Sequence, residues 1–193
     1  MEDRRKVRLK LLTPLLGSLP DKKIFTKMME KKGEIVDQED VEDHYDELSM
    51  LPEETKYTVF PRDVDGIYIM DYQVKGFFKN AGNVLKDILK IKALRKKVDN
   101  YLFITPRFIY LTEKVTGILE RPLRAQTPKG ERVTVVASEY IAEGLEFEFE
   151  ITLLNHKELT WKVVEKLLDY GKYKGLLQWR NGGYGRFKWQ WVK

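Results

Sequence analysis

Residues 145–152 alternate without a break between apolar and polar side chains, and no other feature of the sequence constrains the fold as strongly. Successive side chains of a β-strand point to opposite faces of its sheet, so this pattern predicts a strand with one buried and one solvated face. The apolar set is Leu145, Phe147, Phe149 and Ile151, and the polar set is Glu146, Glu148, Glu150 and Thr152. Residues 4–12 alternate in the same way, with Val7, Leu9 and Leu11 set against Lys6, Arg8 and Lys10. The sequence therefore predicts two half-buried strands, the first with a basic outer face.

Residues 72–91 show the periodicity of an amphipathic helix. The apolar positions lie close to the spacing i, i+3, i+4, i+7 and are Val74, Phe77, Phe78, Ala81, Leu85, Ile88 and Leu89. Asp71 is a suitable N-cap for this helix. Gly76 and Gly82 each cost about 1 kcal/mol relative to alanine inside a helix. We therefore expect another segment to pack close to the helix backbone there.

Shorter patterns predict the remaining elements. A turn at 63–66 joins the expected strands 57–60 and 66–70 into a hairpin. Further strands are expected at 101–105, 108–111, 132–140, 145–154 and 187–192, and short helices at 21–32 and within the acidic segment 34–54. Asn155 and Glu158 resemble a capping box that opens a helix ending near Tyr170.

The order of the main elements is strand, helix, two long strands, helix and strand, with 132–140 and 145–154 as the two middle strands. This βαββαβ order is that of ferredoxin-like domains, which include RRM-like domains. The sequence therefore predicts an α+β fold with a ferredoxin-like core, in a single domain that spans 1–193. Residues 15–70 separate the first strand from the first core helix and form a large insertion in this plan.

Charge is distributed unevenly along the chain. The net charge is +5, yet residues 34–54 contain ten acidic residues and neither Lys nor Arg. The other 172 residues carry 35 basic against 20 acidic side chains, a net charge of +15. A body this basic attracts polyanions such as nucleic acid. The acidic segment 34–54 has two possible interpretations. It offsets the positive charge of the other residues and keeps the protein soluble, or it has a function of its own.

The sequence lacks the residues and spacings of most catalytic and metal sites. It contains no cysteine, which removes disulfides, thiolate catalysis and cysteine-ligated metals. Its two histidines, His44 and His156, have no partners at the spacing of a zinc site, and the glycine motifs of nucleotide-binding proteins and hydrolases are missing. We therefore predict no catalytic residue, no metal and no cofactor. No segment reaches the roughly 18 apolar residues of a membrane span, and no signal peptide is recognisable, so we expect a cytoplasmic protein that does not enter the membrane.

The loop 179–186 is the strongest candidate for a binding site. Its residues are Trp179, Arg180, Asn181, Gly182, Gly183, Tyr184, Gly185 and Arg186. The three glycines let backbone N–H groups turn toward a ligand without interference from a Cβ atom, and a nest of such groups suits phosphate. The two arginines add guanidinium groups for bidentate contacts, and the two aromatic rings offer flat faces for bases. The alternative is a tight connection that needs positive φ angles, with both arginines in solvent.

Two further segments are candidate contacts for an anion. Lys75 and Gly76 lie in the first turn of the long helix, with Lys79 one turn on, where the helix amides and dipole favour negative charge. The alternative there is a glycine that allows close packing and two solvated lysines. A basic, proline-punctuated loop that includes Arg121 and Arg124 is also typical of binding sites. A purely structural excursion explains that loop equally well.

Two motifs resemble those of the RAMP superfamily, the repeat-associated proteins that process CRISPR RNA or form the backbone of CRISPR effector complexes. Residues 72–79 are similar to the S-x-K-G-x-x-R helix start of that superfamily. Residues 179–187 are similar to its glycine-rich loop between the second helix and the last strand. The first strand, with Thr13, Pro14 and Leu15 at its end, belongs to the same resemblance.

The resemblance implies that Lys75, Gly76 and Lys79 lie near an RNA backbone and that residues 180–186 cradle phosphate. The processing members use a histidine near the first helix, whereas His44 of this chain lies in the acidic segment. The resemblance therefore implies a non-catalytic member. The short, cysteine-free chain is also similar to proteins encoded by phages and prophages of Gram-positive bacteria.

Two functions are compatible with these features. The first is a non-catalytic module of RAMP-like fold that binds nucleic acid, RNA in the first place, and assembles with copies of itself or with effector subunits. The second is a phage-encoded factor that binds a protein partner, or blocks a host defence, through the carboxylates of 34–54. An enzyme ranks third, because the sequence shows no residue set for catalysis.

Overall fold

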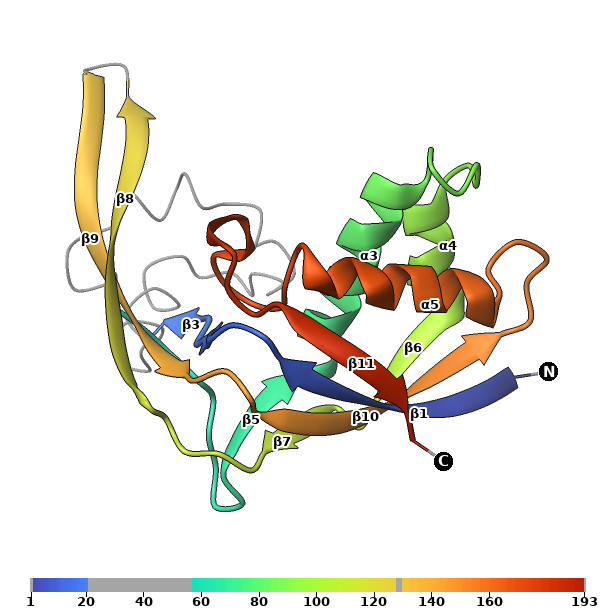
Figure 1. The fold of residues 1–193 in the computed structure, drawn as a ribbon, viewed down its shortest axis with the longest axis horizontal. Coiled ribbons are helices and arrows are strands. Elements are labelled where there is room, and N and C mark those ends of the chain that lie inside the picture. Colours follow the sequence, from blue (N-terminus) through green and yellow to red (C-terminus); the bar gives the residue numbers. More distant parts are fainter. Residues whose placement is uncertain (1, 21–56, 128–129, 193) are drawn as a thin grey trace, which may run out of the picture.

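The computed structural model describes residues 2–20, 57–127 and 130–192. The helix expected at 21–32 and the acidic segment 34–54 lie outside these residues. A four-stranded antiparallel sheet forms the centre of the fold, in the order β11-β1-β10-β6. Its strands are β1 (Glu2–Leu11), β6 (Leu102–Thr105), β10 (Glu146–Leu154) and β11 (Phe187–Trp191). The helices α3 (Asp71–Leu85), α4 (Leu94–Tyr101) and α5 (Trp161–Asp169) lie to one side of this sheet (Figure 1).

The central sheet and its helices have the predicted connectivity. Along the chain, β1 is followed by α3 and α4, then by β6, β10, α5 and β11. This is the βαββαβ order, so the prediction of an α+β, ferredoxin-like fold is confirmed. The second core strand is the short β6, however, so the prediction that residues 132–140 form this strand is wrong. Alternation identifies a strand, but the choice of its partner depends on contacts far apart along the chain.

A second sheet contains the longest strands of the residues that the structure describes. β9 (Gly130–Ile141) pairs with β8 (Gly117–Thr127), so most of the loop expected around Arg121 and Arg124 is strand. β9 also pairs with β2 (Leu15–Leu16) and with β4 (Tyr57–Val59), and β4 pairs with β3 (Leu19–Pro20). Beyond these contacts β8 and β9 continue as a two-stranded arm that extends away from the helices (Figure 1).

The turn predicted at 63–66 forms, but the strands that it joins belong to different sheets. The Asp63 amide donates to the Gly66 carbonyl at 3.0 Å, and Arg62 and Ile67 form an isolated bridge. β4 then pairs with β9, whereas β5 (Ile67–Met70) pairs with β7 (Phe108–Leu111). The predicted hairpin is therefore limited to its turn. Two strands this short gain little from pairing with each other, and β4 pairs instead with the much longer β9.

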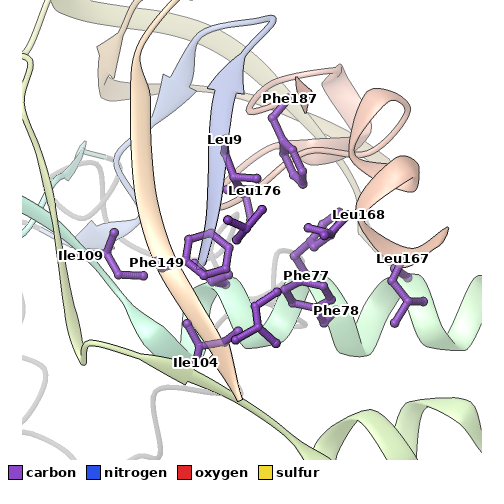
Figure 2. Packing of buried hydrophobic residues seen from close by; sticks show 14 of the residues in the cluster. Leu9, Phe77, Phe78, Ile104, Ile109, Phe149, Leu167, Leu168, Leu176 and Phe187 are labelled. Carbon is purple, nitrogen blue, oxygen red and sulfur yellow. The ribbon is translucent and has the colours of Figure 1, made fainter. Parts of the chain in front are cut away.

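The hydrophobic core fills the space between the central sheet and the helices (Figure 2). Phe77 of α3 contacts Phe187 of β11, with ring centroids 5.0 Å apart. The apolar faces predicted for the first strand and for β10 are both confirmed as buried, with the members Val7, Leu9, Leu11, Leu145, Phe147, Phe149 and Ile151. The alternating patterns of the sequence therefore identify correctly which sheet face the helices cover.

The long helix ends earlier than its periodicity predicts. α3 stops at Leu85, and the chain turns into α4 instead of continuing to residue 91. A Cβ atom at Gly82 would lie 3.3 Å from the Arg95 amide nitrogen, which confirms the expected close approach of another segment to the α3 backbone. The glycine thus allows α4 to fold back against α3.

The start of α3 is capped by a residue other than the expected one. Met70 occupies the N-cap in place of Asp71, and the Met70 amide donates to Gln73 Oε1 at 2.9 Å. Gln73 Nε2 in turn donates to Ser18 Oγ at 2.6 Å. Gln73, which stands where the RAMP motif has serine, therefore both caps α3 and ties it to the segment before β3.

The start of α5 also differs from the predicted capping box. The helix begins at Trp161, with Thr160 as its N-cap. Before it, His156 Nδ1 accepts hydrogen bonds from the Glu158 and Leu159 amides at 3.1 and 3.2 Å. His156 therefore has a structural role in the turn that leads into α5.

Candidate nucleic-acid interface

The glycine loop, residues 171–186, closes tightly on itself between α5 and β11. An added Cβ atom at Gly175 would lie 2.1 Å from the Gly185 carbonyl carbon. The Leu176 amide donates to the Gly185 carbonyl at 2.9 Å, and the Gly185 amide donates to the Pro14 carbonyl at 2.8 Å. Gly183 and Gly185 have φ angles of 87° and 68°, which favour glycine. These contacts make the loop the tight connection that the sequence left open as an alternative.

Several amides expected to bind phosphate donate hydrogen bonds inside the protein instead. The donor–acceptor pairs are Gly182 to the Trp179 carbonyl (2.9 Å), Gly183 to the Arg180 carbonyl (3.1 Å) and Arg186 to Thr13 Oγ1 (2.9 Å). With the Gly185 amide, these donors are satisfied. A backbone cradle for phosphate is therefore not open at these four positions.

Trp179 stacks within the protein. Its ring lies nearly parallel to that of Tyr184, with centroids 5.1 Å apart and an interplanar angle of 15°. The guanidinium carbon of Arg121 lies 4.8 Å from the Trp179 ring centroid, as in a cation–π contact. A Cβ atom at Gly182 would lie 2.9 Å from the same ring, so glycine lets the ring lie against the loop. Base stacking on Trp179 and Tyr184 stays a prediction.

Arg121 joins the base of the β8–β9 arm to the glycine loop. Its side chain is buried, and its guanidinium donates to Ser138 Oγ at 2.8 Å and to Gln178 Oε1 at 2.9 Å. The Thr58 hydroxyl lies 2.6 Å from Ser138 Oγ and 3.0 Å from Gln178 Oε1. Arg121 therefore supports the loop from inside the protein, and its contact with nucleic acid stays a prediction.

The other members of this buried network were not among the predicted residues. Thr58, Ser138 and Gln178 come from β4, β9 and the glycine loop, which are far apart in the sequence. Each is an ordinary polar residue at no recognisable spacing. Buried polar groups require hydrogen-bond partners, but the sequence does not show that these positions are buried.

Three cations, which we call the loop cations, lie on the glycine loop: Lys174, Arg180 and Arg186. Burial lowers the pKa of the Lys174 ammonium, and the charge of the nearby Arg180 lowers it further. The Arg186 guanidinium lies over Gly183, where an added Cβ atom would be 2.9 Å from Nη2. Its Nε is buried and makes no hydrogen bond within the part of the chain that the structure describes. Lys174 is missing from the predicted site because a single lysine after a helix carries no pattern.

Lys75 and Lys79 make contacts with α4 and the residue after it. Lys75 Nζ donates to the Asp99 carbonyl at 2.8 Å and also to the Leu102 carbonyl, so it satisfies carbonyl groups at the C-terminal end of α4. Lys79 Nζ lies 3.5 Å from the Asp99 carboxylate. Both lysines therefore hold α3 against α4. As RNA contacts, they and Gly76 stay predictions.

The structure divides the predicted residues among three places. The residues of the glycine loop meet Arg121 at the base of the β8–β9 arm. Lys75, Gly76 and Lys79 lie on α3, whose lysines face α4. Arg124 lies farther along β8, opposite Val133. Only the first group brings together residues from distant parts of the sequence.

The outer face of the central sheet carries a row of ion pairs. Lys6 and Arg8 of β1 both lie 2.5 Å from Glu148 of β10, and Lys10 lies 2.8 Å from Glu146. The Lys10 hydrogen bond holds the pKa of Glu146 below its ordinary value, and those of Lys6 and Arg8 do the same for Glu148. The basic outer face predicted for β1 is therefore matched by carboxylates of the neighbouring strand, which leaves it little net charge for a polyanion.

We expect these ion pairs to make the stability of the protein fall in acid. The pKa values of Glu146 and Glu148 in the folded protein lie below the ordinary value of about 4.3. Their contribution is therefore complete above about pH 4.3 and is lost as pH falls through the lowered pKa values, because the unfolded chain binds protons first. Urea denaturation at about pH 7 and about pH 3 measures this loss. A Glu146→Gln/Glu148→Gln variant should lose less stability between the two pH values, and an equal loss would contradict the assignment.

Neither a metal cluster nor a membrane helix is found in the residues described. Within 2–20, 57–127 and 130–192, no three His, Cys, Asp or Glu side chains lie close enough together to hold a metal ion. In the same ranges, no helix is long and apolar enough to cross a membrane. His44 lies outside these ranges.

Comparison with known proteins gives a structural likeness and no sequence match. No family model matches the chain, and no curated protein matches it. One similar solved structure is a chain of the Type III-B Cmr-beta complex bound to cognate target RNA, with 9% sequence identity and a TM-score of 0.49. The likeness covers 100% of this chain and 59% of that chain, so the present chain spans less than two thirds of the length of its neighbour. The ferredoxin-like fold is accordingly assigned from the strand order and pairing of the chain itself.

Proposed function

We propose that this chain is a non-catalytic module that binds nucleic acid, RNA in the first place, through the loop cations. The proposal depends on one observation: Lys174, Arg180 and Arg186 lie on a loop in which four backbone amides are already hydrogen-bonded within the protein. The lowered pKa of Lys174 reflects its burial and the nearby charge of Arg180. A phosphate bound between such cations relieves their repulsion, and guanidinium groups bind phosphate strongly.

In this proposal the side chains of the loop contact phosphate, and its backbone supplies rigidity. Trp179 stacks on Tyr184 and on the Arg121 guanidinium, and Arg121 bonds to the buried network, so these contacts support the loop from inside. A rigid loop loses little conformational entropy when it binds. Arg124, whose backbone lies opposite Val133 on the β8–β9 arm, belongs to the same proposal as a further contact.

Two properties of the sequence support a polyanion as the ligand and RNA in particular. Outside 34–54 the chain has a net charge of +15, which attracts a phosphate backbone. The resemblance of 72–79 and 179–187 to RAMP motifs favours RNA over DNA. Assembly with copies of itself or with effector subunits belongs to the same proposal.

The Arg180→Ala/Arg186→Ala variant tests this function. We expect it to bind a fluorescein-labelled single-stranded RNA of about 20 nucleotides about tenfold more weakly than the wild type. Each phosphate contact to a single strand contributes about 0.7 to the slope of log K against log salt concentration, so the slope should fall by about 1.4. Fluorescence anisotropy titrations between about 50 and about 200 mM KCl measure both quantities.

A matched control separates the site from the total charge. Lys157 lies before α5 and Lys162 lies within it, and both are exposed. The Lys157→Ala/Lys162→Ala variant loses the same charge as the arginine variant. It should change affinity and slope far less than the arginine variant. Unchanged binding by a correctly folded arginine variant, as judged by circular dichroism, would reject the loop as the site. Failure of the wild type to bind any RNA would reject the function.

A further inference from the structure

The turn between α3 and α4 presents a second group of cations, which the sequence-based site does not include. Its five exposed members, which we call the basic knuckle, are Lys86, Lys90, Lys92, Arg95 and Lys96. Asp87 is the only acidic residue between positions 86 and 97. The knuckle lies on the side of the molecule away from the β8–β9 arm (Figure 1). It is therefore separate from the network at the base of that arm.

The charges of the knuckle are not balanced by neighbouring carboxylates. Within the three described ranges, none of its five side chains forms an ion pair or a hydrogen bond. Nearby lysines behave differently: Lys97 pairs with Glu158, and Lys79 pairs with Asp99. Two lysines of this region, Lys79 and Lys97, therefore hold α3, α4 and the segment before α5 together. The four lysines and one arginine of the knuckle face solvent.

The backbone of the knuckle is fixed by hydrogen bonds and by buried anchors. The Ile91 amide donates to the Lys86 carbonyl at 2.9 Å, and Ile91 and Leu94 are both buried in the core. Lys90 and Ala93 have φ angles of 55° and 51°, in the left-handed region that costs energy for residues other than glycine. The surrounding contacts therefore impose this conformation, and strain of this kind is often found where a surface is functional.

We propose that the basic knuckle is a second contact for the phosphate backbone of nucleic acid. The inference rests on the proposed function and adds a surface to it. Phosphates present a regular row of like charges, which a row of cations matches without a groove or any fixed shape. A protein partner would need complementary shape and buried apolar contacts. The turn exposes Ile88, but one apolar side chain among five cations offers such a partner little apolar surface to bury. Binding here is independent of base sequence.

The variant Lys86→Gln/Lys92→Gln/Arg95→Gln/Lys96→Gln tests this inference. It leaves Lys90, because of its φ angle, and Lys97, because of its ion pair. With the same labelled RNA, we expect affinity at about 50 mM KCl to fall at least tenfold and the salt slope to fall by about 2 to 3. A Lys86→Arg/Lys92→Arg/Lys96→Arg variant should retain wild-type affinity, since it keeps the charge.

A charge-matched control and a competitor decide between the possible outcomes. The control is Arg107→Gln/Lys114→Gln/Lys157→Gln/Lys162→Gln, which removes four exposed cations outside both the knuckle and the glycine loop. An equal loss in this control would overturn the inference, because total charge alone would then explain the effect. Competition by poly-glutamate as effective as that by unlabelled RNA of equal charge would overturn the assignment to nucleic acid.

The failure of this inference is distinguishable from the failure of the proposed function. If the knuckle variant binds RNA as the wild type does, while the loop variant with Arg180→Ala and Arg186→Ala binds weakly, the knuckle inference fails and the function stands. If the wild type itself does not bind RNA, both fail. If only the knuckle variant loses affinity, the knuckle is supported, and the loop cations are rejected as the primary site.

Discussion

The Gly175→Ala variant should lose about 3 kcal/mol of its free energy of unfolding. This loss is a large part of the total free energy of unfolding of a marginally stable domain. The added methyl group would lie 2.1 Å from the Gly185 carbonyl carbon and 2.2 Å from the Tyr184 carbonyl oxygen. These neighbours are backbone atoms, so they cannot rotate away as a flexible side chain would. The clash can be relieved only if the segment around Gly175 moves away from the segment around Gly185. That movement breaks the hydrogen bond between the Leu176 amide and the Gly185 carbonyl.

Urea denaturation followed by circular dichroism measures this loss. The Gly144→Ala variant is the control, because Gly144 has a φ angle of 97° and no atom within 4 Å of an added Cβ. Backbone strain alone should then cost about 1 kcal/mol. A Gly175→Ala variant no less stable than the Gly144→Ala variant would show that the loop is looser than its contacts imply.

Neutralising the acidic segment should raise the affinity for RNA about a hundredfold at low salt. The variant changes the ten acidic residues of 34–54 to the corresponding amides, which raises the net charge from +5 to +15. A body with three times the net charge attracts a phosphate backbone more strongly, and the gain should shrink as salt screens it. The anisotropy titrations used for the arginine variant measure the effect.

Two outcomes would favour the rival function, in which the carboxylates of 34–54 bind a protein partner. The first is unchanged RNA affinity in the neutralised variant. The second is a change in RNA affinity when the residues of 34–54 are placed in scrambled order, since that control keeps the charge and should bind RNA as the wild type does. The experiment therefore tests whether the segment acts by charge or by sequence.

The parts of the fold that depend on local pattern were predictable from the sequence. The alternation around Phe149 and around Leu9 identifies which face of each strand is buried, because a period of two places every second side chain on the same face. The partner of each strand was not predictable in this way. Residues 132–140 have a stronger strand pattern than 102–105, yet the short strand completes the central sheet and the long one forms the arm.

The candidate site shows the same limit. The glycines of 179–186 indicate correctly that the loop needs positive φ angles. Glycine is equally suited to an open nest for phosphate and to a tight crossing of two backbone segments. The choice between them depends on Gly175 and Pro14, which lie outside the motif and contact it only in the folded chain. Arg121 shows the same for charge, because an arginine expected in a basic binding loop is buried against Trp179.

The row of ion pairs between β1 and β10 also bears on how the two strands find their register. A slip of one residue would place Lys6 opposite Ile151 and Arg8 opposite Phe149, so both charge and burial oppose it. A slip of two residues would place Arg8 opposite Glu150, and every side chain would keep its face. Alternation and charge therefore exclude odd slips and tolerate even ones.

The correct even alignment must then be selected at the end of the strands. There the Gly144 amide donates to the Leu11 carbonyl at 3.0 Å, and the Leu11 amide donates to the Leu145 carbonyl at 2.9 Å. A shift of two residues toward the turn would pair Lys10 with Gly144, whose φ angle of 97° is not that of a strand. The turn before β10 therefore opposes a slip in that direction, which the complementary faces of the two strands would tolerate.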